Sequence, residues 1–323
     1  MKAFVYKKYG PPDVLQLKDI EKPAPKDNEV LVKVHAASVN AADWHLLTAD
    51  IFAVRLMMGL TRPKRSVLGA DVAGVVEAVG KNVTQFKPGD AVFGCIFMHG
   101  SGSFAEYAVC IEDSLVPKPG ILSFEEAAAV PLASITALQA MQKAGTSLQG
   151  KEVLIQGAGG GVGTFALQLA KYFGAIVTAV CGPGNVEQSR SLGADHVVDY
   201  TKENAFTGGK RFDAILGING FQPSSVYKRA LKENGVYIMV GGNPRQIFQG
   251  VLMGPLLALG SRKKFLALSA KANKRDLDFI KERIVEGRIK PVIDKRFSFE
   301  KTADAMRYLG QGHAHGKIVV VMV

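Results

Sequence analysis

Cysteine is scarce in this sequence. The 323 residues include three cysteines, Cys95, Cys110 and Cys181. They lie far apart, and none belongs to a C-x-x-C pair, which argues against a disulfide framework and against a cysteine-rich zinc site. The first residues also lack the apolar core and cleavage site of a secretory signal. We therefore expect a cytoplasmic protein whose thiols stay reduced.

Long hydrophobic runs are absent too. The longest apolar segment, VLMGPLLALG at 251–260, contains glycine and proline and falls well short of the ~20 residues that cross a bilayer. Hydrophobic residues make up 47% of the chain and charged residues 21%, a balance typical of globular proteins. Because single domains cluster near ~100–200 residues, the length predicts two domains. No transmembrane segment is expected.

The sequence has an excess of positive charge but no recognised nucleic-acid-binding motif. Its formal net charge is +11, and the basic residues are dispersed along the chain. Such a charge favours polyanions in general, including a phosphorylated cofactor, but we expect no specific nucleic-acid partner. One alternative stays open: a non-enzymatic, dinucleotide-regulated protein that contacts RNA or a membrane surface through this charge and the 251–260 segment.

The pattern of apolar residues changes along the chain. In the first part, short alternating runs are separated by turn residues, which predicts a mainly antiparallel barrel or sandwich. An alanine-rich stretch then predicts two helices divided at Pro131. From Lys151 onward, strands and helices alternate as in a doubly wound parallel sheet, and the end of the chain is β-rich again. We predict an α/β protein with an inserted Rossmann dinucleotide-binding domain at 126–270, and a β-rich catalytic domain formed by 1–125 and 271–323.

A glycine-rich turn joins the first strand of the alternating region to its first helix. It comprises Gly157, Ala158, Gly159, Gly160, Gly161, Val162 and Gly163. Glycines let the backbone turn tightly and approach a pyrophosphate, while the N–H groups and dipole of the helix N-terminus attract its charge. The sequence therefore predicts a dinucleotide site.

The end of the next strand bears on which dinucleotide binds. Folds that prefer NAD usually place an acidic residue there for the ribose 2′-OH, whereas this sequence has Cys181, Gly182 and Asn185. NADP(H) is favoured, because no carboxylate would repel a 2′-phosphate. NAD(H) stays open, because this turn contains no arginine or lysine.

With these features in place, the whole chain resembles the medium-chain dehydrogenases/reductases, and within them the zinc-free quinone oxidoreductases, zeta-crystallin-like proteins and enone reductases. The matching segments are AASVNAADWH (36–45), GADVAGVVEAVG (69–80), KPGDAVFG (87–94), GSFAEYAV (102–109), QGAGGGVG (156–163), SLGADHVVDY (191–200) and GHAHGKIVV (312–320). The resemblance implies a GroES-like fold for the β-rich domain and a homodimer.

The resemblance also bears on metals. Zinc-dependent members hold their catalytic metal with three side chains, and the matching positions here are Asn40, Ala70 and Leu132. Alanine and leucine cannot bind a metal and asparagine is a poor zinc ligand, so we expect no catalytic zinc. The cysteine-rich lobe that carries structural zinc is absent. His313 and His315 lack a third ligand, and we expect no metal there.

Several residues gain roles from the resemblance. Asn40 and Thr136 would contact the nicotinamide ribose region, and Val240 and Gly241 would meet the nicotinamide. The residues expected around the adenosine ribose and any 2′-phosphate are Cys181, Gly182, Asn185 and Tyr200. His45 is the candidate proton donor, with solvent as its competitor. Asp71, an acid among apolar residues, is interpreted as a structural carboxylate that needs a hydrogen-bonding or ionic partner.

The expected chemistry follows from the missing metal. Zinc polarises a simple carbonyl, whereas hydride addition to a quinone, enone or enal gives a delocalised anion that hydrogen bonds stabilise. We therefore predict zinc-independent, NAD(P)H-dependent reduction of quinones or activated C=C bonds. A zinc-free alcohol dehydrogenase is the second alternative.

Overall fold

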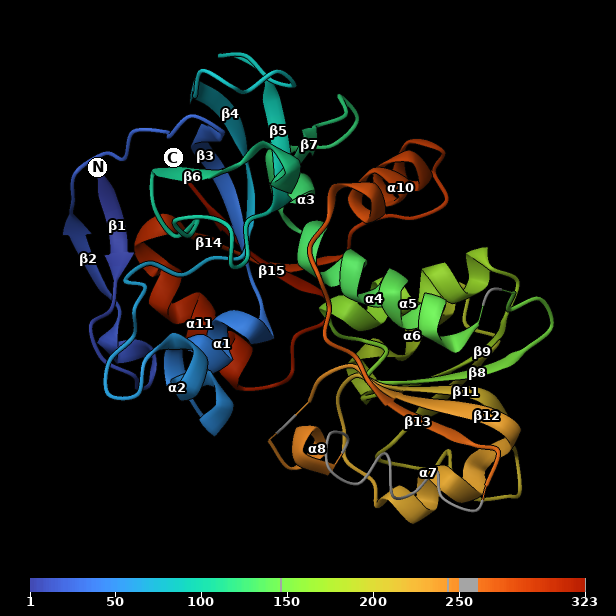
Figure 1. The fold of residues 1–323 in the computed structure, drawn as a ribbon. Helices are drawn as coiled ribbons and strands as arrows, with labels where there is room; N and C mark the ends of the chain where they lie inside the picture. Colours follow the sequence, from blue (N-terminus) through green and yellow to red (C-terminus); the bar gives the residue numbers. More distant parts are fainter. Residues whose placement is uncertain (146, 243, 250–260, 323) are drawn as a thin grey trace. The chain divides into compact units, whose positions relative to one another are not determined.

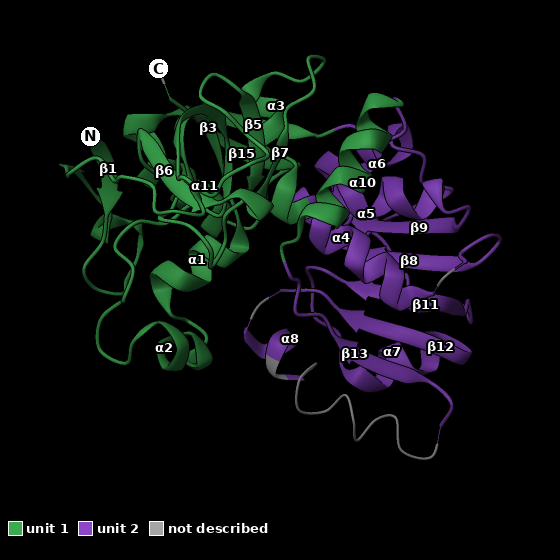
Figure 2. Cartoon of the chain, turned by 45° about the horizontal axis from the view of Figure 1, so that its top comes forward, with its two compact units in different colours: residues 1–133, 272–286, 291–323 green, residues 134–271, 287–290 purple. Residues whose placement is uncertain are grey.

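The computed structural model describes residues 1–145, 147–242, 244–249 and 261–322 (Figure 1). The apolar 251–260 segment lies outside the described residues. Contacts divide the chain into two compact units (Figure 2). Unit 1 comprises Met1–Ala133, Ala272–Glu286 and Pro291–Val323, and unit 2 comprises Ser134–Lys271 and Gly287–Lys290. The domain boundaries derived from the sequence stay predictions.

Unit 1 is built on a seven-stranded sheet with the order β14-β15-β3-β4-β5-β7, in which β6 also pairs with β3. The strands are β3 (Glu29–Val39), β4 (Asp71–Val79), β5 (Ala91–Cys95), β6 (Tyr107–Ile111), β7 (Leu115–Pro117), β14 (Ile293–Ser298) and β15 (Lys317–Val321). All pairs are antiparallel except β14 with β15. A separate antiparallel pair joins β1 (Lys2–Val5) to β2 (Gln16–Asp19). The mainly antiparallel prediction is confirmed, and the chain does return to this unit at its end.

The helices of unit 1 include two that the sequence analysis did not predict. These are α1 (Ala41–Thr48) and α2 (Phe52–Met58). Both are short and give little periodic signal. The other helices are α3 (Phe124–Ala128), α10 (Lys274–Val285) and α11 (Thr302–Gly310). The predicted break at Pro131 is confirmed, because α4 (Pro131–Ala144) begins at that residue.

Unit 2 contains a six-stranded sheet with the order β10-β9-β8-β11-β12-β13, and every pair in it is parallel. The strands are β8 (Glu152–Gln156), β9 (Ile176–Cys181), β10 (His196–Asp199), β11 (Phe212–Gly217), β12 (Leu231–Met239) and β13 (Lys264–Ala267). The helices are most of α4, α5 (Gly161–Tyr172), α6 (Val186–Ser191), α7 (Ser224–Ala230) and α8 (Pro244–Phe248). Figure 1 shows α4, α5 and α6 on one face of the sheet and α7 on the other. The doubly wound prediction is confirmed.

The strand order of unit 2 reverses between β8 and β11. The carboxyl ends of the strands align at one edge, since Gln156 pairs with Gly217, and Gly217 pairs with Met239. In open α/β sheets this edge, at the point of reversal, is where ligands bind. None of the described helices is both long and apolar enough to span a membrane.

Candidate functional site

Asp71 is fully buried at the start of β4 and both of its carboxylate oxygens accept hydrogen bonds. Ser38 lies opposite Asp71 in the β3–β4 register, and its hydroxyl donates to Oδ2 over 2.6 Å. The side-chain amide of Asn40 donates to the same oxygen over 2.9 Å, and the backbone N–H of Leu132 donates to Oδ1 over 2.8 Å. A buried carboxylate is tolerated when it has such partners. The structural interpretation of Asp71 agrees with these contacts.

Lys317 supplies the positive charge beside this carboxylate. Its side chain is 3% exposed, and Nζ lies 3.5 Å from Oδ2 of Asp71. Nζ also donates to Oδ1 of Asn40 over 2.5 Å. The antiparallel pairing of β15 with β3 places Ile318 opposite Val39, which brings the preceding Lys317 next to Asn40. The sequence analysis missed this residue, although a lysine directly before the apolar run IVVV is a signal of a buried charge that needs a partner.

A second buried acid lies one turn into α1. Asp43 is 1% exposed, and its carboxylate accepts the backbone N–H of Asn40 over 2.9 Å and that of Gly69 over 3.1 Å. Burial, reinforced by the negative charge of Asp71, raises the pKa of Asp43 to about 7. The interior of unit 1 therefore holds two carboxyl groups and one ammonium, with a carboxyl group that exchanges its proton near neutral pH.

The glycine-rich turn of unit 2 connects β8 to α5, and several of its glycines have no room for a side chain. A Cβ on Gly163 would lie 2.1 Å from the carbonyl oxygen of Gly157, and one on Gly157 would lie 2.7 Å from the backbone nitrogen of Asn219. Gly157 also has a φ of +87°, which favours glycine. A Cβ on Gly160 would meet only one atom, at 3.9 Å. The turn is therefore packed tightly against the sheet on one side and open at Gly160, the residue that precedes α5.

The residues predicted around the adenosine ribose lie together at the end of β9. Cys181 is the last residue of β9, and its carbonyl accepts the N–H of Tyr200 over 3.1 Å. A Cβ on Gly182 would lie 3.2 Å from the Tyr200 hydroxyl, and one on Gly159 would lie 2.3 Å from Cγ of Asn185. The structure thus joins this group to the glycine-rich turn. Their contacts with a cofactor stay predictions.

The other predicted cofactor residues occupy both units. The N–H of Val240 donates to the carbonyl of Gly217 over 2.9 Å, so Val240 and Gly241 continue β12 at the same sheet edge as the glycine-rich turn. Thr136 lies in α4 of unit 2 and is 8% exposed, while Asn40 belongs to unit 1 and is 7% exposed. Their roles at the nicotinamide ribose stay predictions.

Comparisons with known proteins identify the family. An alcohol dehydrogenase GroES-like domain matches residues 26–120, and a zinc-binding dehydrogenase domain matches residues 192–320. A chloroplast envelope quinone oxidoreductase homolog of Arabidopsis thaliana is 37% identical over 99% of this chain and 98% of its own. The chain belongs to the medium-chain dehydrogenase/reductase superfamily.

Other members of the superfamily agree with this assignment. A chloroplastic NADPH-dependent alkenal/one oxidoreductase of Arabidopsis thaliana is 36% identical over 99% of this chain and 79% of its own. The solved structure of the quinone oxidoreductase from Coxiella burnetii matches with a TM-score of 0.88 and 30% identity, covering 99% of each chain. Within the superfamily, this chain lies in the quinone oxidoreductase branch and is an NAD(P)H-dependent oxidoreductase.

The positions that carry catalytic zinc in other members of the superfamily do not fit a metal here. The Asn40 amide is bonded to Asp71 and Lys317, Ala70 offers a methyl group, and Leu132 contributes only its backbone N–H. Zinc needs sulfur, imidazole nitrogen or carboxylate oxygen, usually from at least three side chains. Among the residues that the structure describes, no three His, Cys, Asp or Glu side chains are grouped to hold an ion.

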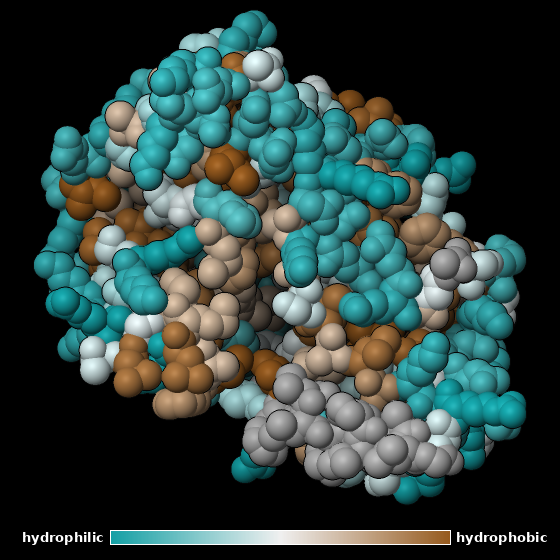
Figure 3. All heavy atoms as spheres, viewed as in Figure 1, coloured by the Kyte–Doolittle hydropathy of each residue, from teal (hydrophilic) through white to brown (hydrophobic). Residues whose placement is uncertain are grey.

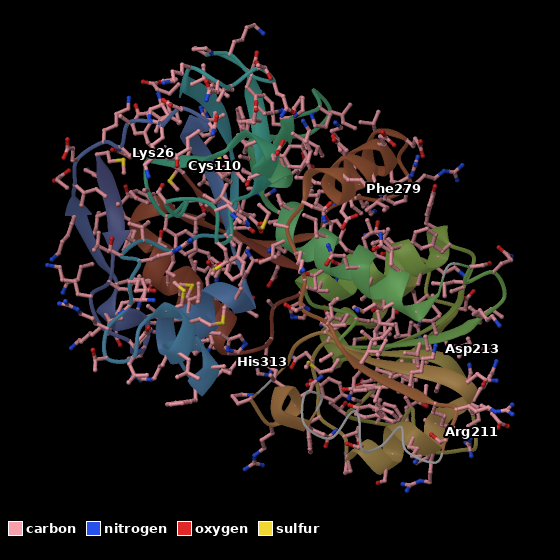
Figure 4. The ribbon with its side chains drawn as sticks, in the orientation of Figure 1. Lys26, Cys110, Arg211, Asp213, Phe279 and His313 are labelled. Carbon is pink, nitrogen blue, oxygen red and sulfur yellow. The ribbon has the colours of Figure 1, made fainter. Side chains whose placement is uncertain are left out.

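The histidines predicted from the superfamily pattern lie apart from this network. Nδ1 of His45 is 2.7 Å from Oδ1 of Asp50. Because a carboxylate only accepts, the proton lies on Nδ1 and Nε2 is left as the second ring nitrogen. His45 therefore has a fixed orientation, and its proton-donor role stays a prediction. His313 is exposed on the loop after α11 (Figure 4), and the backbone N–H of His315 donates to Asp294.

The three thiols have no nucleophilic role in this arrangement. Burial raises the pKa of Cys95, Cys110 and Cys181 above the ordinary thiol value. They remain neutral at physiological pH, so reactivity through a thiolate is not expected.

An exposed apolar surface lies on unit 1 at α2 and the loop after it. Phe52 is 67% exposed, Leu56 and Met57 are each 63% exposed, and Leu60 is 60% exposed. Figure 3 shows hydrophobic side chains gathered over this helix. Apolar side chains that are exposed together often mark binding surfaces.

Proposed function

We propose that this oxidoreductase transfers hydride from NADPH to quinones or to the activated C=C bonds of enones and enals, without zinc. One observation carries the proposal: the three positions that bind catalytic zinc in other members hold an amide, a methyl group and a backbone N–H, all packed around Asp71. Without a Lewis acid, the substrates that remain favourable are those whose reduced anion is delocalised.

The glycine-rich turn supports the cofactor assignment. The first N–H groups of α5 have no partner within the helix, and the open side at Gly160 leaves room for a pyrophosphate beside them. When bound, NADPH supplies the hydride. The backbone N–H groups would hold the diphosphate, and Asn40 and Thr136 would orient the nicotinamide ribose.

The preference for NADP(H) is supported by the end of β9. Cys181 and Gly182 stand where NAD-preferring folds place an acid, so a 2′-phosphate meets no carboxylate in that turn. A relative that is 36% identical is named an NADPH-dependent alkenal/one oxidoreductase. NADH is expected to bind more weakly than NADPH.

The second step of the reduction is protonation. Hydride addition leaves negative charge on a substrate oxygen, and a proton neutralises it. Nε2 of His45 is the candidate donor because Asp50 fixes the other ring nitrogen, and solvent is the alternative. The apolar surface at α2 suits an apolar substrate.

The assembly and location of the protein are also proposals. The superfamily resemblance favours a homodimer. The name of one relative places it at the chloroplast envelope, whereas a cytoplasmic location is what we predict for this chain.

The function is tested by following NADPH and NADH oxidation in parallel against quinones, 2-alkenals, enones and simple ketones. We expect turnover of quinones or conjugated carbonyls, faster with NADPH, and little turnover of simple ketones. Turnover of simple alcohols and ketones alone would favour a zinc-free alcohol dehydrogenase instead. Absence of binding to either nucleotide in a fluorescence titration would rule out both enzymes.

A further inference from the structure

The buried ammonium of Lys317 has its hydrogens committed to the protein. Nζ carries three hydrogens and has three acceptors around it: Oδ1 of Asn40 at 2.5 Å, the carbonyl of Val39 at 3.5 Å and Oδ2 of Asp71 at 3.5 Å. The side chain is 3% exposed. Lys317 therefore does not act on a substrate directly. Its shortest contact, and its strongest effect, is on Asn40.

The amide of Asn40 has one favourable orientation as a result. Its oxygen accepts from Lys317, and its nitrogen donates to Oδ2 of Asp71 over 2.9 Å and to the carbonyl of Ser38 over 3.3 Å. An ammonium can only donate and a carboxylate can only accept, so a flipped amide would oppose both charges. An amide oxygen has two lone pairs. Lys317 uses one of them and leaves Oδ1 able to accept one further hydrogen bond.

We propose that Lys317 is a positioning residue for the cofactor site, because it fixes the Asn40 amide with its oxygen ready to accept from a ribose hydroxyl on the nicotinamide half of NAD(P)H. This inference rests on the proposed function, which assigns Asn40 to that ribose. The lysine performs with a side chain what a metal does in zinc-dependent members, namely orienting groups around a positive charge. It does so without polarising the substrate.

A double-mutant cycle between Lys317 and Asn40 tests this role. The four proteins are the wild type, Asn40→Ala, Lys317→Met and the double variant, and the readout is the dissociation constant of NADPH from fluorescence titration. We expect each single substitution to weaken binding by about tenfold, the effect of one hydrogen bond to a charged or fixed group. In the double variant we expect little further loss, because Lys317 acts through Asn40.

A general structural role of Lys317 predicts a different result. In that case Lys317→Met weakens NADPH binding as much in the Asn40→Ala background as in the wild type, and the inference is wrong. It is also wrong if either single variant binds NADPH as the wild type does. Lys301→Met is the matched control, since it removes a lysine that is exposed on the same unit, and we expect its affinity to equal that of the wild type.

Two further points keep the test decisive. If Lys317→Met fails to fold because Asp71 is left without its counter-ion, the same cycle is measured in an Asp71→Asn background, where the replacement removes no paired charge. The coupling between positions 40 and 317 is then expected to persist, and additive losses there would overturn the inference. A wild-type protein that binds neither NADPH nor NADH contradicts the proposed function itself, whereas wild-type binding without coupling contradicts only the role of Lys317.

Discussion

Lys317 and Asp71 form an ion pair inside unit 1, with Nζ 3.5 Å from Oδ2 and side chains that are 3% and 0% exposed. The two residues are 246 positions apart in the sequence. A buried charge of either sign is costly without its partner. The pair therefore explains why an acid can stand among the valines and glycines of β4.

Asp71→Asn leaves the Lys317 ammonium without its carboxylate. We expect the free energy of unfolding to fall by about 3–5 kcal/mol, as for the loss of one partner in a buried pair, and to recover in part in Asp71→Asn/Lys317→Met. Urea unfolding measures both. Glu77→Gln is the control because Glu77 pairs with Lys22 on the surface, with side chains 39% and 40% exposed, and we expect it to lose less than about 1 kcal/mol. Equal losses in the two carboxylate variants would contradict the account.

Asp43 should make stability depend on pH. Its pKa is raised from 3.8 to about 7, so between these values the folded protein holds a proton that the unfolded chain has released. The free energy of unfolding then falls as pH rises through this window, by at most about 1.4 kcal/mol per pH unit, and the effect is complete above about pH 7.

The pH effect is isolated by comparing the wild type with Asp43→Asn, which cannot titrate. Urea unfolding of both proteins from about pH 5 to about pH 8 should show a stability difference that changes with pH in the predicted window and becomes constant above it. Parallel curves over the whole range would mean that Asp43 ionises normally. A constant offset between the curves is expected as well, because asparagine cannot accept both backbone hydrogen bonds that Asp43 accepts.

The glycine-rich turn offers a matched pair of substitutions. A Cβ at position 163 would lie 2.1 Å from a backbone oxygen, whereas one at position 160 would come no closer than 3.9 Å to any atom outside its chain neighbours. We expect Gly163→Ala to lower the free energy of unfolding by about 1–3 kcal/mol through overpacking, and Gly160→Ala to lower it by much less. Thermal unfolding with and without NADPH measures the effect. Similar melting temperatures for the two variants would contradict the tight packing at Gly163.

The cofactor preference is open to reversal at Gly182. Its φ of −78° suits any residue, so Gly182→Asp adds the acid that NAD-preferring folds carry without straining the backbone. We expect kcat/KM with NADPH to fall by about tenfold or more through repulsion of the 2′-phosphate, while NADH is affected less. Gly182→Asn is the uncharged control. An unchanged ratio of the two kcat/KM values would place the 2′-phosphate elsewhere.

Local patterns in the sequence predicted much of the fold. The glycine-rich turn predicted the β8–α5 junction because its residues are contiguous and glycine is required there for packing. Alternating strands and helices predicted the parallel sheet, and Pro131 predicted the start of α4. The helices α1 and α2 were missed because each is shorter than about three helical turns, and so short a segment gives a weak periodic signal.

The partners of Asp71 were beyond local reasoning. Ser38, Leu132 and Lys317 reach it only through strand pairing and chain return, and no sequence spacing encodes those contacts. The analysis identified the need for a partner, because a carboxylate in an apolar segment is costly alone, but it did not find Lys317. Similarly, the pKa of Asp43 depends on burial and on the charge of Asp71, which only the folded chain reveals.

The central claim is that hydride transfer proceeds without zinc. The most direct measurement is NADPH-dependent quinone or enone reduction by protein treated with a strong chelator, with zinc content determined on the same sample. The account predicts full turnover with far less than one zinc per chain and no gain on adding zinc. Loss of activity on chelation that returns in proportion to added zinc would contradict it.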